Sequence, residues 1–127
     1  MNREVIQTSA APKAIGPYSQ AIRVGDLVFI SGQIAFDPLT MELVNNDIES
    51  EIRQIFENLE AIARAADGSL AKACKLNVYL TDLGHLAKVN EVIMKYCSEP
   101  YAARTSIGVS ALPRGARVEI EVILHFG

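Results

Sequence analysis

The sequence predicts an α+β fold in which two helices pack on one face of a β-sheet. Segments with apolar residues at every second position alternate with two segments that carry apolar residues at helical spacing. Half of the 127 residues are hydrophobic and 21% are charged, which is ordinary for a folded chain. That length suits one domain spanning residues 1–127, with a core of its own.

The first quarter of the chain reads as strands and a loop. The segment 10–18 contains two prolines and a glycine, which exclude a helix. Gly32 interrupts a run of β-branched and aromatic residues, which indicates a bulge or a close backbone approach. Extended segments are expected at residues 4–8, 19–24 and 27–34.

Two helices and another strand are expected in the middle of the chain. A helix over residues 47–66 has an apolar stripe, can be capped by Asn46 or Asp47, and is ended by Gly68. A second helix runs from about Leu83 to Tyr96, with Asp82 as its cap. Between the helices lies a half-buried strand in which four residues alternate inward, namely Cys74, Leu76, Val78 and Leu80.

Two strands, separated by a Leu-Pro-Arg-Gly break, end the chain. Period two places Val118, Ile120, Val122 and Leu124 on one face of the last strand. The opposite face then carries Arg117, Glu119, Glu121 and Ile123. Two helices on one side leave the other side of the sheet uncovered, and we expect that apolar side to pack against another subunit.

Charge and composition exclude several classes of function. The net charge is −3 and no run of Lys and Arg occurs, so neither nucleic acid nor an anionic membrane is an expected partner. Neither a signal peptide nor a stretch of 18 apolar residues is present, and a cytoplasmic location is expected. Cys74, Cys97 and the two histidines match no metal spacing, and no cofactor motif occurs.

Arg104 and Glu119 are the candidate functional residues. A guanidinium binds a carboxylate through two parallel hydrogen bonds, and a glutamate can hold a water molecule. If the two last strands lie close in one sheet, both side chains can serve one cleft. The residue pattern alone equally allows a structural ion pair at Arg104 and a solvated sheet face at Glu119. Tyr18, Ser31 and Asn90 could likewise be structural.

Several motifs in a fixed order resemble the Rid (YjgF-type) family of reactive intermediate/imine deaminases. Each motif is weak alone, but together they cover nearly the whole chain with similar spacings. The matching segments are Ala14-Ile-Gly-Pro-Tyr-Ser-Gln-Ala21, Ser31-Gly-Gln-Ile34, Asn58-Leu59, Val89-Asn-Glu-Val92, Ala103-Arg-Thr105, Leu112-Pro-Arg and Val118-Glu-Ile-Glu121.

The resemblance implies a chorismate-mutase-like α+β fold, a homotrimer with clefts between neighbouring subunits, and no metal or organic cofactor. It implies hydrolysis of short-lived enamine and imine acids, such as 2-aminoacrylate, to 2-oxo acids and ammonia. Such acids are released by enzymes that use pyridoxal phosphate.

The resemblance also assigns residues. It makes Arg104 the ligand of the substrate carboxylate and selects Glu119, not Glu121, as the catalytic acid–base. The remaining substrate-binding positions are Tyr18, Ser31, Gly32, Asn90, Thr105 and Ser106. Many members have cysteine where this chain has Ser106 and proline where it has Ala102. A thiol-dependent mechanism is therefore not expected, and the loop before Arg104 is expected to be looser.

Two other functions are compatible with the sequence. One is a non-catalytic module that binds small carboxylates or a protein partner, although simple binding would need only Arg104. The other is RNA cleavage, an activity ascribed to some relatives as endoribonucleases and translation inhibitors. The acidic balance and the lack of a basic stripe count against nuclease activity.

Overall fold

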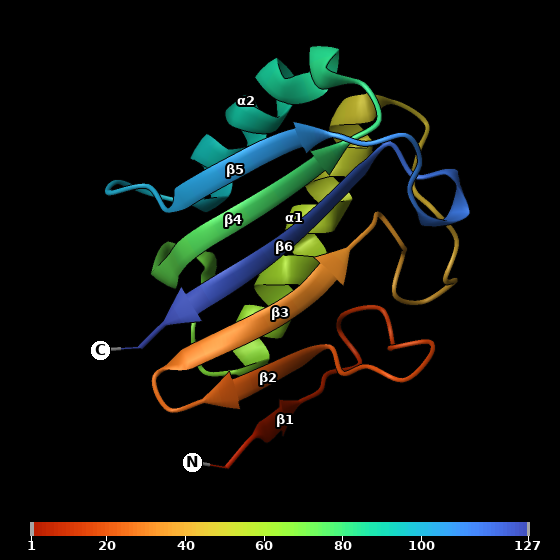
Figure 1. Ribbon diagram of the computed structural model, residues 1–127. Coiled ribbons are helices and arrows are strands. Elements are labelled where there is room, and N and C mark those ends of the chain that lie inside the picture. Colours follow the sequence, from red (N-terminus) through yellow and green to blue (C-terminus); the bar gives the residue numbers. More distant parts are fainter. Residues whose placement is uncertain (1, 127) are drawn as a thin grey trace.

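The computed structural model describes residues 2–126 as one six-stranded sheet with two helices on the same face (Figure 1). The spatial order of the strands is β1-β2-β3-β6-β4-β5, and every neighbouring pair is antiparallel except β4 with β5. The strands are β1 (Glu4–Ile6), β2 (Ala21–Val24), β3 (Leu27–Gln33), β4 (Ala73–Leu80), β5 (Ala103–Gly108) and β6 (Val118–His125). The helices are α1 (Ile48–Ala65) and α2 (Leu86–Tyr96). The predicted α+β fold is confirmed.

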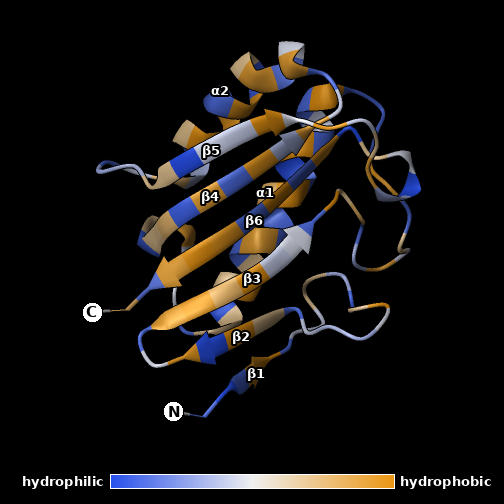
Figure 2. Ribbon diagram, viewed as in Figure 1, coloured by the Kyte–Doolittle hydropathy of each residue, from blue (hydrophilic) through white to orange (hydrophobic). Residues whose placement is uncertain are grey.

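Alternation along the strands separates the two faces of the sheet. Residues 118, 120, 122 and 124 of β6 are buried beneath the helices, and those between them are half-buried on the other face. Figure 2 shows hydrophobic and hydrophilic bands alternating in the same way along β4. The helices contribute their apolar stripes to this core, chiefly Ile52, Ile55, Phe56, Leu59 and Ile62 of α1 and Val89, Val92 and Ile93 of α2.

Helix α1 begins and ends at local hydrogen bonds. The Asp47 carboxylate accepts from the Ser50 amide at 2.8 Å, which makes Asp47 the N-cap. At the other end Asp67 takes a left-handed φ of 63°, and the Gly68 amide donates to the carbonyl of Ala63 at 2.9 Å. This hydrogen bond satisfies a carbonyl left free by the end of the helix.

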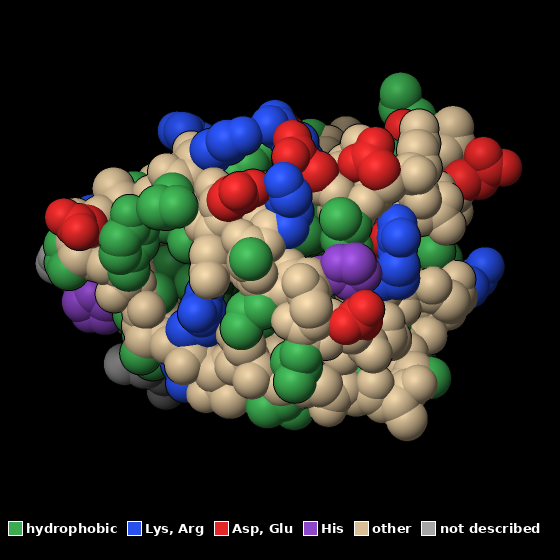
Figure 3. Space-filling view, turned by 90° about the horizontal axis from the view of Figure 1, so that it is seen from above, with side chains coloured by type: hydrophobic (Ala, Val, Ile, Leu, Met, Phe, Trp, Pro, Cys, Tyr) green, Lys and Arg blue, Asp and Glu red, His purple; other side chains and the backbone are tan. Residues whose placement is uncertain are grey.

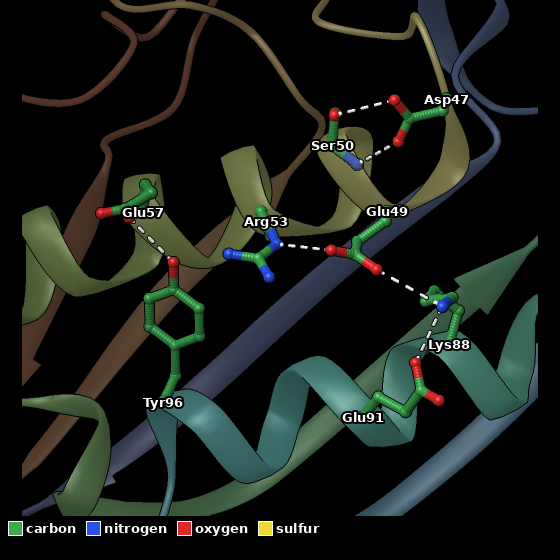
Figure 4. A network of polar contacts seen from close by, with 8 residues as sticks. All are labelled: Asp47, Glu49, Ser50, Arg53, Glu57, Lys88, Glu91 and Tyr96. Atoms are coloured by element: carbon green, nitrogen blue, oxygen red, sulfur yellow. Dashed lines mark hydrogen bonds and ion pairs between the residues drawn. The ribbon is translucent and has the colours of Figure 1, made fainter.

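Polar contacts join α1 to α2 along their solvent side (Figure 4). Lys88 of α2 pairs with Glu49 of α1 at 3.3 Å and with Glu91 of its own helix at 2.8 Å. The Tyr96 hydroxyl donates to Glu57 at 2.8 Å. Solvent screens such exposed ion pairs, so they contribute little to stability and link the two helices at their surface.

A buried carboxylate links the start of α1 to the start of β6. Glu51 is fully buried and accepts from the Nε of Arg117 at 2.7 Å and from its backbone amide at 2.8 Å. Arg117 also donates to the carbonyl of Asn45. The expectation that Arg117 lies on the uncovered face with Glu119 is therefore wrong, because Arg117 precedes β6 and its side chain reaches the helix side.

Two further expectations need correction. Cys74 is exposed, because the β4–β6 register shifts between Ala73 and Lys75 and the inward alternation begins only at Leu76. The segment expected to open the second helix, Leu83–His85, is a separate 3-10 turn. There the Asp82 carboxylate accepts from the Gly84 amide at 2.8 Å, which tightens the chain before α2 begins.

The face of the sheet away from the helices is uncovered and partly apolar, and it faces the viewer in Figure 1. Phe29 of β3 and Ile107 of β5 lie on it with 42% and 44% of their surfaces exposed. No helix within residues 2–126 combines the length and the apolar character needed to cross a membrane.

Candidate active site

A cleft of about 530 Å³ lies where β3 and β6 approach the segment 10–20 and the turn 113–115. Four of the eight predicted site residues line it, namely Tyr18, Ser31, Gly32 and Glu119. They come from three parts of the chain far apart in sequence. The remaining lining residues include Lys13, Gln20, Phe36, Arg114 and Glu121.

Glu119 projects from β6 into this cleft and rests on Gly32 of β3. A Cβ atom at position 32 would overlap the Glu119 carboxylate, so glycine lets this carboxylate lie directly against the backbone of β3. The β3–β6 register shifts between Ile30 and Gln33, as expected for a bulge around Gly32. Burial, and secondarily the charge of Glu121, raise the pKa of Glu119 above its ordinary value. A carboxyl with a raised pKa is a stronger base once it is ionised.

Glu121 lies two residues along the same face and is held by two hydrogen bonds. Its Oε1 accepts from the Tyr79 hydroxyl at 2.7 Å and from the Asn77 amide at 3.0 Å. These two donors come from β4, which is paired with β6. Glu121 is therefore fixed beside Glu119, and its negative charge acts on that neighbour from a constant position.

Ser31 and Tyr18 have structural partners as well as places in the cleft. The Ser31 hydroxyl donates to the carbonyl of Ser19 at 2.6 Å, and the Tyr18 hydroxyl accepts from the amide of Ile15 at 3.3 Å. The first contact fixes the segment 15–19 against the end of β3, and the second closes that segment on itself. Each hydroxyl thus shapes the wall of the cleft.

Buried Gln20 organises the loop in front of these residues. Its Nε2 donates to the carbonyls of Thr8, Ala11 and Pro12 at 3.0, 3.3 and 2.8 Å, and its Oε1 accepts from the Thr8 amide at 2.7 Å. Buried polar groups of a loop need such partners. The loop is held in one conformation although it lacks regular secondary structure.

Arg104 and Asn90 lie on the other side of the sheet. Arg104 of β5 is paired with Leu76 of β4, whose side chain is buried toward the helices. Accordingly the Arg104 Nη1 donates to the Oδ1 of Asn90 on α2. These two residues line a separate pocket of about 410 Å³ between α2 and β5.

Arg104 and Glu119 therefore do not serve one cleft within one chain, and that expectation is wrong. The physical reason is the strand order, because β4 lies between β5 and β6 and the two residues point to opposite faces. The two residues can meet only if Arg104 comes from a second copy of the chain.

Thr105 and Ser106 follow Arg104 along the edge strand β5. The Thr105 hydroxyl accepts from the Lys75 Nζ at 3.2 Å on the uncovered face. Within residues 2–126 the buried Ser106 hydroxyl has no hydrogen-bond partner. Since β5 is the last strand of the sheet, its outer backbone groups are open to a ligand or another chain.

Sequence reasoning missed two cations in the cleft, Lys13 and Arg114. Neither belongs to a periodic segment. The Leu-Pro-Arg-Gly stretch indicated a break between strands and, as Leu112-Pro-Arg, a segment that resembles the family, but no role was assigned to Arg114. Glu121 was visible in the Val-Glu-Ile-Glu pattern, which places it on the same face as Glu119.

Comparison with known proteins agrees with this fold. A family model described as endoribonuclease L-PSP matches residues 8–126. RutC family protein y4sK of Sinorhizobium fredii is 50% identical over 121 residues, which cover 95% of this chain and 96% of that protein. The 2-iminobutanoate/2-iminopropanoate deaminase of Mus musculus is 43% identical over 121 residues, covering 95% and 90%.

The solved structure of RidA from Psychrobacter sp. PAMC 21119 has a TM-score of 0.93 to this chain. The two sequences are 52% identical, and the match covers 97% of this chain and 99% of that one. Since the family model and these relatives span almost the entire chain, the protein belongs to the Rid family, also called YjgF or RutC.

Proposed function

We propose that this protein is a 2-iminobutanoate/2-iminopropanoate deaminase that hydrolyses enamine and imine acids, such as 2-aminoacrylate, to 2-oxo acids and ammonia. The observation that supports it most is Glu119, a half-buried carboxyl of raised pKa set on Gly32 in a cleft. The mouse relative that bears this name is 43% identical. The substrates would come from enzymes that use pyridoxal phosphate, and we place the reaction in the cytoplasm, where such short-lived products would be met.

The chemistry requires one water molecule, one base and an anchor for the substrate carboxylate. Arg104 would hold that carboxylate, and ionised Glu119 would take a proton as water attacks the C=N carbon. Protonation of nitrogen by Glu119 gives an amino alcohol. Glu119 then passes the hydroxyl proton to this nitrogen as the carbonyl forms and the C–N bond breaks, so that nitrogen leaves as ammonia and Glu119 is ionised again. This proposed sequence balances without a metal or organic cofactor.

The proposed site needs two chains, because Arg104 lies on the helix side of the sheet and Glu119 on the uncovered side. We propose a homotrimer in which the uncovered faces meet and Arg104 of one chain approaches Glu119 of its neighbour. The exposed Phe29 and Ile107 on that face support such burial. The open edge of β5 would bring the backbone of Thr105 and Ser106 to the same carboxylate.

RNA cleavage is the second candidate, because the matching family model is described as an endoribonuclease. On the face shown in Figure 3, acidic and basic side chains are interspersed without a continuous basic stripe. The net charge of −3 also gives no general attraction to a polyanion. These observations favour the deaminase over the nuclease, and Glu119 favours it over a module that only binds carboxylates.

The test is the rate of 2-oxo acid release from 2-iminopropanoate, measured above the spontaneous hydrolysis. Glu119→Gln should lower the rate by about 10²–10⁴-fold, because an amide cannot accept the proton. Arg104→Lys keeps the charge but loses the planar fork, and should lower kcat/KM by about tenfold. Glu42→Gln, at an exposed position outside the cleft, is the matched control. Full activity in either site variant would overturn the proposal.

A further inference from the structure

The rim of the Glu119 cleft carries two cations that the proposed reaction does not use. Lys13 and Arg114 both line the cleft and both are exposed. In the part of the chain that the structure describes, neither forms an ion pair. The two carboxylates of the cleft, Glu119 and Glu121, lie deeper, on the strand.

Arg114 is held in place by a constrained turn. Its backbone has a left-handed φ of 58°, which is uncommon for a residue with a Cβ atom. The amide of buried Ala116 donates to the Pro113 carbonyl at 3.0 Å and closes this turn. The guanidinium carbon lies 5.9 Å from the centre of the ring of Phe36, which also lines the cleft, and this cation–π contact favours a position of the charge at the cleft.

Lys13 likewise projects from a fixed backbone. It follows Pro12, whose carbonyl accepts from the buried Gln20 amide at 2.8 Å. The backbone at Lys13 is therefore fixed, and only its flexible side chain can move. The rim of the cleft therefore carries the guanidinium of Arg114, which has a fixed position, and the ammonium of Lys13, which can move.

An imino acid with a single carboxylate, held by Arg104 of a neighbouring chain, would leave both rim cations without a ligand. A second carboxylate on the substrate side chain would give them one. We infer that this cleft takes dicarboxylic 2-imino acids, with Arg114 binding the side-chain carboxylate and Lys13 adding a second positive charge. The inference rests on the proposed function, since it names the substrate class of the same site.

The test compares 2-iminosuccinate with 2-iminopropanoate. Both are generated in situ, by flavin-dependent oxidation of aspartate and of alanine, and release of the 2-oxo acid is followed with malate or lactate dehydrogenase. The quantity of interest is kcat/KM for 2-iminosuccinate divided by kcat/KM for 2-iminopropanoate. Wild type should give a ratio of one or more.

Arg114→Gln should lower this ratio by about tenfold, because it removes a charged hydrogen bond that only the dicarboxylate makes. Lys13→Gln should lower it less, and Arg114→Lys should restore part of it. Lys72→Gln, outside the cleft, makes the same change in net charge and should keep the wild-type ratio.

A ratio that stays at its wild-type value in Arg114→Gln overturns the inference. This includes an equal loss on both substrates, which would make Arg114 a ligand of the carboxylate that all imino acids share. If the protein hydrolyses 2-iminopropanoate and Arg114→Gln leaves the ratio unchanged, the proposed function stands and only this inference is refuted. If the protein accelerates the hydrolysis of neither substrate, both proposals are refuted.

Discussion

Glu119 combines three features that suit a base: a place in a cleft, partial burial, and a second carboxylate fixed beside it. Burial disfavours the ionised form, and the charge of Glu121 does so too. The activity should therefore fall on the acid side of the pH profile, as Glu119 becomes protonated, at a higher pH than for an ordinary glutamate.

Glu121→Gln should move this acid limb to lower pH. The substitution removes the negative charge that helps to raise the pKa of Glu119, while the amide oxygen can still accept from Tyr79 and Asn77. The measurement is kcat against pH for 2-iminopropanoate. Tyr79→Phe is the control, since it keeps the carboxylates of Glu119 and Glu121 and should not shift the acid limb to lower pH. An unmoved limb in Glu121→Gln would contradict the predicted effect of the Glu121 charge on the pKa of the catalytic base.

At the level of single residues, short motifs predicted more than periodicity did. Alternation placed Glu119 and Glu121 on one face but could not choose between them, whereas contact with Gly32 distinguishes Glu119. Arg114 escaped prediction because its position depends on a left-handed turn and on Phe36, which is remote in sequence. No local pattern encodes that contact.

The elements themselves were largely predictable, because each is specified by local patterns. The stripe of α1, its Asp47 cap and the alternation of β6 all match the structure. The order of the strands was not predictable in this way, since pairing is decided by contacts between distant segments. That order inserts β4 between β5 and β6 and so separates Arg104 from Glu119.

The junction of α1 with β6 depends on the buried pair of Glu51 and Arg117. Arg117→Met should lower the free energy of unfolding by about 3 kcal/mol, because it leaves a carboxylate buried without its charged partner. Arg53→Met removes only a solvent-screened pair with Glu49 and should cost much less than Arg117→Met. Urea denaturation at one fixed protein concentration measures both, and equal small losses would contradict this role.

At the scale of the whole molecule, one chain keeps the two parts of the proposed site apart. The cleft around Glu119 lies at the end of β3 and the start of β6, whereas Arg104 sits with Asn90 beneath α2. In the homotrimer that we propose, the partly apolar uncovered face is the surface through which the copies meet. The sequence could predict that face from alternation, but the geometry of association lies beyond what one chain encodes locally.

The most direct test of this account is complementation between two inactive variants. Subunits carrying Arg104→Ala are mixed with subunits carrying Glu119→Gln, dissociated and reassembled, with differently tagged chains to verify exchange. A site shared between two chains is intact wherever Glu119 of the first variant meets Arg104 of the second. At equal amounts about one quarter of the sites should then regain wild-type activity on 2-iminopropanoate. Mixed oligomers that show no activity above either variant alone would contradict the shared site.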